Sequence, residues 1–78
     1  MAAKRKKNPE IKVGEKFHWW DRDLWHIVNI FKDGDCEMIV LKSWAKYKNR
    51  WVYNVEYKES LEYFFSTSIY KEVNSKEA

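Results

Sequence analysis

Hydrophobic and polar residues alternate with a period of two along most of residues 16–57, the pattern of half-buried β-strands. Three short polar segments interrupt the alternation, at Asp21-Arg22-Asp23, Asp33-Gly34 and Lys48-Asn49. Asp-Gly readily takes the positive φ of a tight hairpin turn, and Asn also tolerates it. The pattern therefore predicts four strands joined by three hairpins into an antiparallel meander.

The three turns also predict which residues lie opposite each other. The expected pairs are Lys32 with Asp35, Phe31 with Cys36, Asn29 with Met38, Ile27 with Val40, Val28 with Ile39, His26 with Leu41, Trp20 with Leu24, Trp19 with Trp25, His18 with His26, Phe17 with Ile27, Lys46 with Trp51, Trp44 with Tyr53 and Lys42 with Val55. A shift of one residue would move a strand's side chains to the other face, so these pairs decide which residues form the core.

This register divides the hydrophobic residues between two faces of the sheet. One face is mainly aliphatic and is expected to form the core: Trp20, Leu24, Val28, Ile30, Ile39, Leu41, Ala45 and Val52. The other face holds four of the five tryptophans: Val13, Phe17, Trp19, Trp25, Ile27, Phe31, Met38, Val40, Trp44, Trp51, Tyr53, Val55 and Tyr57. A chain of this size can scarcely enclose both sets, so part of the aromatic face is expected to stay exposed.

The last third of the chain predicts a short helix followed by a fifth strand. Leu61, Phe64 and Phe65 have the i, i+3, i+4 spacing of one helical face, and Ser60 is a suitable cap for a turn over 60–66. Residues 69–73 then alternate again. The expected fold is all-β with one short helical turn: a five-stranded antiparallel meander that closes into a small barrel. This order of elements resembles that of SH3-like barrels.

Length and composition indicate one small domain inside the cell. The chain has 78 residues, of which 45% are hydrophobic and 35% charged, enough apolar material for one core. No apolar run approaches a membrane span, and no apolar segment follows the N-terminal charges, so we expect neither a membrane partner nor secretion. The single cysteine, Cys36, cannot form an internal disulfide, which favours the reducing cytoplasm.

Positive charge is concentrated at the N-terminus. Residues 1–12 have five basic residues against one acidic residue, a net charge of +4, whereas the remaining chain has ten basic and eleven acidic residues, a net charge of −1. We therefore expect a flexible basic arm over 1–12, a domain over 13–73 and a disordered tail over 74–78. The arm is either a solubilising tail or a contact for nucleic acid through Lys4, Arg5, Lys6 and Lys7.

A second basic segment, residues 42–55, combines cations with aromatic residues and no acid. Its candidate binding residues are Lys42, Trp44, Lys46, Tyr47, Lys48, Arg50, Trp51 and Tyr53. Nucleic acids bind such surfaces through phosphate contacts and base stacking, and protein interfaces are also rich in Trp, Tyr and Arg. A purely structural interpretation also remains, in which lysine stems cover partly buried rings.

Catalytic and metal-binding arrangements are weak in this sequence. His18 and His26 could face each other near Asp21 and Asp23, but a structural or catalytic zinc needs three or four ligands in close geometry. The acids around Cys36 should disfavour its thiolate. With two glycines there is no phosphate-binding loop, so we expect no enzyme, no cofactor and no metal.

Two binding functions therefore remain. We expect a module that binds a protein partner, as an adaptor or inhibitor would, through the aromatic and basic hairpin. The alternative is a small nucleic-acid-binding domain that uses the same hairpin together with the basic arm. The net charge of −1 outside the arm favours the protein partner.

Overall fold

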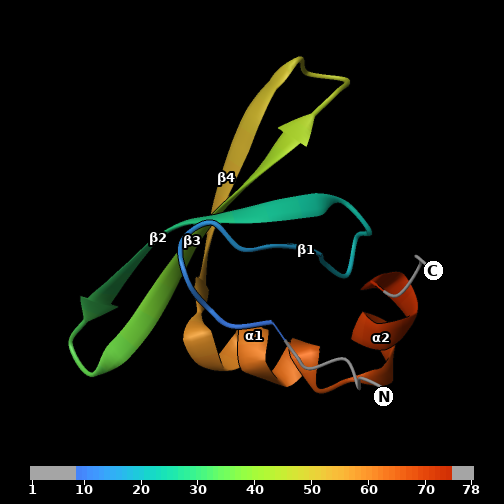
Figure 1. Cartoon of the computed structure of the whole chain (residues 1–78). Coiled ribbons are helices and arrows are strands. Elements are labelled where there is room, and N and C mark those ends of the chain that lie inside the picture. Colours follow the sequence, from blue (N-terminus) through green and yellow to red (C-terminus); the bar gives the residue numbers. More distant parts are fainter. Residues whose placement is uncertain (1–8, 75–78) are drawn as a thin grey trace.

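A four-stranded antiparallel sheet, covered on one face by two short helices, makes up the domain (Figure 1). The computed structural model describes residues 9–74, so the arm residues Lys4, Arg5, Lys6 and Lys7 and the end of the tail, 75–78, lie outside it. The elements are β1 (Lys16–His18), β2 (Leu24–Asp33), β3 (Cys36–Ala45), β4 (Arg50–Tyr57), α1 (Lys58–Phe65) and α2 (Ser68–Asn74). Each strand pairs with the next in the chain, so the predicted meander is confirmed for these four strands.

The predicted fifth strand and closed barrel are wrong. Residues 69–73 lie in α2, and β1 and β4 form the two edges of an open sheet in the part of the chain described. The Thr67 side-chain oxygen accepts a hydrogen bond from the Tyr70 backbone N–H, 3.2 Å away, as an N-cap does. Tyr70 and Val73, three residues apart, then face the core on one side of the helix.

The core lies between the sheet and the helices. Its buried cluster consists of Phe17, Trp25, Ile27, Ile39, Leu41, Leu61, Phe64 and Phe65. The helical spacing of Leu61, Phe64 and Phe65 therefore identified the buried side of α1 correctly. This helix begins at Lys58 with Tyr57 at its N-cap, so Ser60 lies inside the first turn and is not the cap.

A β-bulge at Val28 changes which residues of β2 face the core. Ile27 pairs with Leu41, but Asn29 pairs with Val40, so the register shifts between them. Ile27 and Ile30 consequently reach the same face although they are three residues apart. The predicted division of faces is thus wrong before the bulge: Phe17, Trp25 and Ile27 are core residues. It is right after the bulge for Ile30, and on the later strands for Ile39, Leu41, Ala45 and Val52.

Leu24 and Trp20 also leave the predicted aliphatic core. Leu24 lies on the opposite face and is 40% exposed. Trp19 and Trp20 belong to a five-residue loop, 19–23, because Phe17 pairs with Trp25 instead of Ile27. The predicted three-residue loop was therefore too short.

The other two hairpin turns also differ in position from the prediction. In the β2–β3 hairpin the loop residues are Gly34 and Asp35, and Gly34 comes first with a φ of +67°, as a type II′ turn requires. In the β3–β4 hairpin four residues, 46–49, form the loop. Asn49 has a φ of +55°, which confirms its expected left-handed conformation.

One residue on each side of the predicted domain, 13–73, makes contacts with it. Ile11, assigned to the arm, packs against the core cluster. Asn74, assigned to the tail, accepts a hydrogen bond from the His18 N–H at 2.6 Å and donates one to the His18 carbonyl at 2.8 Å. Neither helix of residues 9–74 has the length and apolar character needed to cross a membrane.

Candidate functional site

The sheet face opposite the helices, here called the outer face, is covered by no other helix or strand of residues 9–74 (Figure 1). It is rich in large hydrophobic residues. All four strands contribute to it, and strand alternation places its side chains away from the core. Its exposed hydrophobic residues, each at least 37% exposed, are Leu24, Phe31, Trp44, Trp51, Tyr53, Val55 and Tyr57. Isolated exposed hydrophobic residues are common, whereas contiguous exposed sets are typical of interaction surfaces.

Trp51 lies at the centre of a cluster on this face. The ring of Trp44 is 5.2 Å away between centroids in an edge-to-face arrangement, and the His26 ring is 5.5 Å away in the same geometry. The ammonium of Lys42 lies 4.2 Å from the centroid of the Trp51 ring, within the range of a cation–π contact. These contacts hold the Trp51 ring in place while more than a third of its surface stays exposed.

A row of basic residues crosses the middle of the outer face. Lys16 pairs with His26, His26 with Lys42, and Lys42 with Tyr53. Neither lysine has an ion-pair partner within residues 9–74. Partial burial, and then the charges of Lys16 and Lys42, lower the pKa of His26 below its usual 6.5. The row is thus a region of uncompensated positive charge between exposed rings.

The tip of the β3–β4 hairpin holds the remaining candidates from the sequence. Tyr47 is 85% exposed, and the Lys48 ammonium lies 5.7 Å from its ring centroid. Lys46 is in the loop and does not face Trp51, since Trp51 pairs with Trp44. Arg50 pairs with Ala45 instead of facing Tyr47, so alternation directs it away from the outer face.

The structure therefore brings four of the eight predicted residues together: Lys42, Trp44, Trp51 and Tyr53 share the outer face. It adds Lys16, His26 and Leu24, which sequence reasoning missed. The predicted register placed His26 opposite Leu41 in the aliphatic core. The bulge at Val28 moves His26 to the outer face, and no residue type near Val28 indicates a bulge. Val55 and Tyr57 could have been added to the predicted binding residues, because they continue the alternation of Trp51 and Tyr53 along β4.

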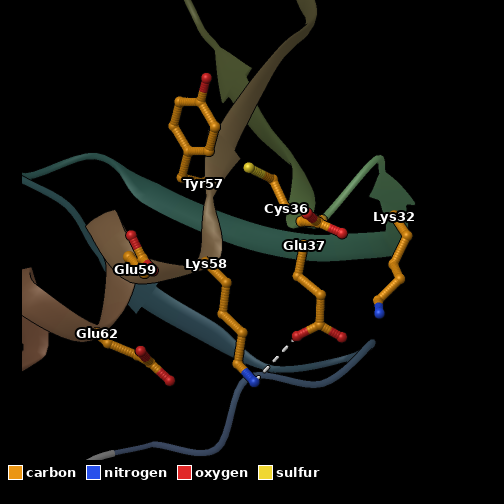
Figure 2. Close-up of a pocket in the computed structure, with 8 residues that line it drawn as sticks. Lys32, Cys36, Glu37, Tyr57, Lys58, Glu59 and Glu62 are labelled. Atoms are coloured by element: carbon orange, nitrogen blue, oxygen red, sulfur yellow. Dashed lines mark ion pairs between the residues drawn. The ribbon is translucent and has the colours of Figure 1, made fainter.

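A hollow of about 450 Å³ beside the β2–β3 turn contains Cys36 (Figure 2). Cys36 and Tyr57 point to one side of the strands, and Glu37 and Lys58 to the other. The Lys58 ammonium is 3.1 Å from a Glu37 carboxylate oxygen, and this hydrogen bond, with the charge of Glu37, raises the pKa of Lys58. His26 pairs with Lys42, which lies six residues from Cys36 along β3. About 20 Å therefore separates the Cys36 thiol from the His26 imidazole. The two are too far apart to act together.

The proposed facing pair of histidines is absent from the sheet. His18 pairs with Leu24, and His26 pairs with Lys16. The His18 ring nitrogen Nδ1 lies 3.1 Å from the Arg22 carbonyl oxygen, inside the β1–β2 loop. Among residues 9–74, no three His, Cys, Asp or Glu side chains are grouped so that they could hold a metal ion.

Comparison with known proteins adds no functional information. No family model, curated protein or solved structure matches the chain.

Proposed function

We propose that this protein is a binding module that captures a protein partner on its outer face. The observation that carries the proposal is the contiguous set of exposed hydrophobic residues on the sheet face without helices. Trp51 and Tyr53 would lie near the centre of such an interface, where aromatic residues contribute most of the binding energy.

Aliphatic residues among the rings favour a protein over a nucleic acid. Leu24 and Val55 are exposed on the outer face, and Val40 is half-buried between Asn29 and Val55. Bases gain free energy by stacking on flat rings, whereas branched aliphatic side chains pack best against the side chains of a protein. The basic row of Lys16, His26 and Lys42 would then receive acidic groups of the partner.

Single-stranded nucleic acid is the second candidate, and the basic row is the observation that favours it. Lys16 and Lys42 could contact phosphates while bases stack on Tyr53 and Tyr57, both more than half exposed. The net charge of −1 outside the arm counts against nucleic-acid binding. However, Lys16 and Lys42 lie together on one face of the sheet, so the charge is positive at that place.

A capture experiment tests the proposal. The protein is immobilised and incubated, with and without nuclease, with an extract of the cells that express it, and bound proteins are identified by mass spectrometry. We expect nuclease-resistant capture of a specific protein that Tyr53→Glu abolishes. Ile69→Glu is the control, because Ile69 on α2 is also exposed, at 41%, and lies on the helix side of the domain, opposite Tyr53.

The salt dependence of binding separates the two candidates. Binding of a labelled oligothymidine should weaken with a log–log slope of about 0.7 per phosphate contacted, whereas a hydrophobic protein interface depends less on salt. Capture that both variants retain equally would refute the outer face as the binding site. Loss of all capture after nuclease treatment, with steep salt dependence, would establish nucleic acid in place of a protein partner.

A further inference from the structure

A second site lies on the helix side of the domain, away from the outer face. The β1–β2 loop, the end of β4 and α1 line an open hollow of about 470 Å³. Its lining consists of Trp19, Trp20, Glu56, Glu59, Ser60 and Tyr63. Three aromatic residues and two carboxylates thus line one open hollow, which is here called the aromatic cage.

The two indoles form walls at right angles. The ring centroids of Trp19 and Trp20 are 6.4 Å apart, and the ring planes meet at 86°. Both rings pack on the buried ring of Phe64, with centroid distances of 4.7 Å and 4.6 Å, so the core holds the walls in place. Even so, Trp20 is 43% exposed and Tyr63 is 67% exposed, which leaves aromatic surface open to a ligand.

The carboxylates give the aromatic cage a negative charge. Neither Glu56 nor Glu59 has an ion-pair partner within residues 9–74. Asn54 donates a hydrogen bond to one oxygen of Glu56, at 2.9 Å, and the other oxygen remains available. The nearest lysine in sequence, Lys58, is paired with Glu37 in the neighbouring hollow (Figure 2). Of residues 9–74, none that lines the aromatic cage is basic.

We propose that the aromatic cage binds an organic cation of the quaternary ammonium type, either free or as a methylated lysine side chain. Aromatic faces attract cations through the ring quadrupole, and carboxylates at the edge add charge attraction. Methylated ammonium groups are favoured over a primary ammonium because the ring walls cannot replace the hydrogen bonds that a primary ammonium makes with water. The site does not depend on the function proposed for the outer face.

The first test compares two probes of the same shape. Choline and 3,3-dimethylbutanol differ in one central atom, a positively charged nitrogen or a neutral carbon. In calorimetric titrations of the full chain, we expect choline to bind about tenfold more tightly. Equal affinities, or no choline binding at all, would overturn the proposal, because the hollow would then be apolar or closed.

Variants locate the binding to the aromatic cage. Trp20→Leu keeps apolar volume against Phe64 but removes one wall, and should weaken choline binding about tenfold. Glu59→Gln should weaken it severalfold by removing one charge. Tyr53→Leu, on the outer face, is the control and should leave choline affinity unchanged. If Trp20→Leu fails to fold, Tyr63→Leu replaces it, since that ring is mostly exposed. Unchanged affinity in the folded wall variant would overturn the assignment.

Short peptides distinguish the two sources of the cation. A peptide with trimethyl-lysine that binds more tightly than choline would identify a modified protein segment as ligand. Affinity equal to that of choline would identify a small free cation. Tighter binding of the unmodified lysine peptide than of the trimethylated one would contradict the role assigned to the rings.

Discussion

Leu41 occupies the middle of β3 and is only 1% exposed. It pairs with Ile27 on one side and belongs to the same buried cluster as Leu61 and Phe64. Leu41→Ala should lower the free energy of unfolding by about 2–5 kcal/mol, because the cavity left behind cannot fully collapse. Urea denaturation measures this, with the exposed Val55→Ala as a control of small effect. An unshifted transition for Leu41→Ala would mean that the buried face is assigned incorrectly.

His26 makes the stability depend on pH in a defined direction. Its pKa is lowered in the folded protein, first by burial and then by Lys16 and Lys42, so the unfolded chain takes up a proton at higher pH. The free energy of unfolding should therefore decrease as the pH falls through 6.5, and this contribution should level off below the folded pKa. His26→Gln should flatten that part of the curve in denaturation series from pH 8 to 5. An NMR titration in which the His26 ring has a midpoint above 6.5 would contradict the prediction.

Among the elements, α2 shows why part of the fold could not be predicted. Ile69 and Val73 would lie on the same face of a strand, while Tyr70 and Val73 fit a helical spacing, and a run this short is compatible with both structures. The cap at Thr67 and the packing of Tyr70 on Phe64 and Phe65 select the helix. Local sequence does not contain these tertiary contacts, so the sequence alone could not exclude the barrel.

Strand β2 shows the same limit for the candidate site. The alternation predicted its existence and the side-chain pattern after Val28 correctly. The bulge is stabilised by core packing on both sides of it. Trp25 and Ile27 belong to the buried cluster, and Ile30 packs against the same cluster. Sequence periodicity assumes an unbroken strand, so it placed His26 in the core and left it out of the site. The later strand, β4, has no shift, so Trp51 and Tyr53 were assigned to the correct face, although each pairs with a residue of β3 two positions from the predicted one.

Asn74 connects α2 to the edge of the sheet, and its replacement tests that connection. Its side-chain amide makes two hydrogen bonds with the His18 backbone, as a neighbouring strand would. Asn74→Ala should lower the free energy of unfolding by about 1–3 kcal/mol, since two backbone groups lose their partner. Asn74→Asp should cost more, because a carboxylate would face the His18 carbonyl. Hydrogen exchange at the His18 amide should accelerate in both variants; unchanged exchange would show that α2 does not protect β1.

For the whole molecule, the fold brings residues of like charge together at two places. Glu56, Glu59 and Glu62 lie on or beside the helix side, whereas Lys16 and Lys42 lie on the outer face. The net charge near zero in the sequence outside the arm therefore conceals two local sites of opposite charge. An acidic partner would be attracted to the outer face, and a cation to the aromatic cage, without competition between them.

Two double variants with the same change in net charge test whether the position of the cations determines binding. Lys16→Glu with Lys42→Glu alters the basic row, and Lys46→Glu with Arg50→Glu alters the hairpin tip. Long-range attraction falls equally in both, so any difference in affinity for the captured partner, or for oligothymidine, reports local contacts. We expect the row variant to bind at least tenfold more weakly than the tip variant at physiological salt, while both melt cooperatively. A larger loss of affinity in the tip variant would place the binding site at the hairpin tip, around Lys46 and Arg50, and not across the sheet.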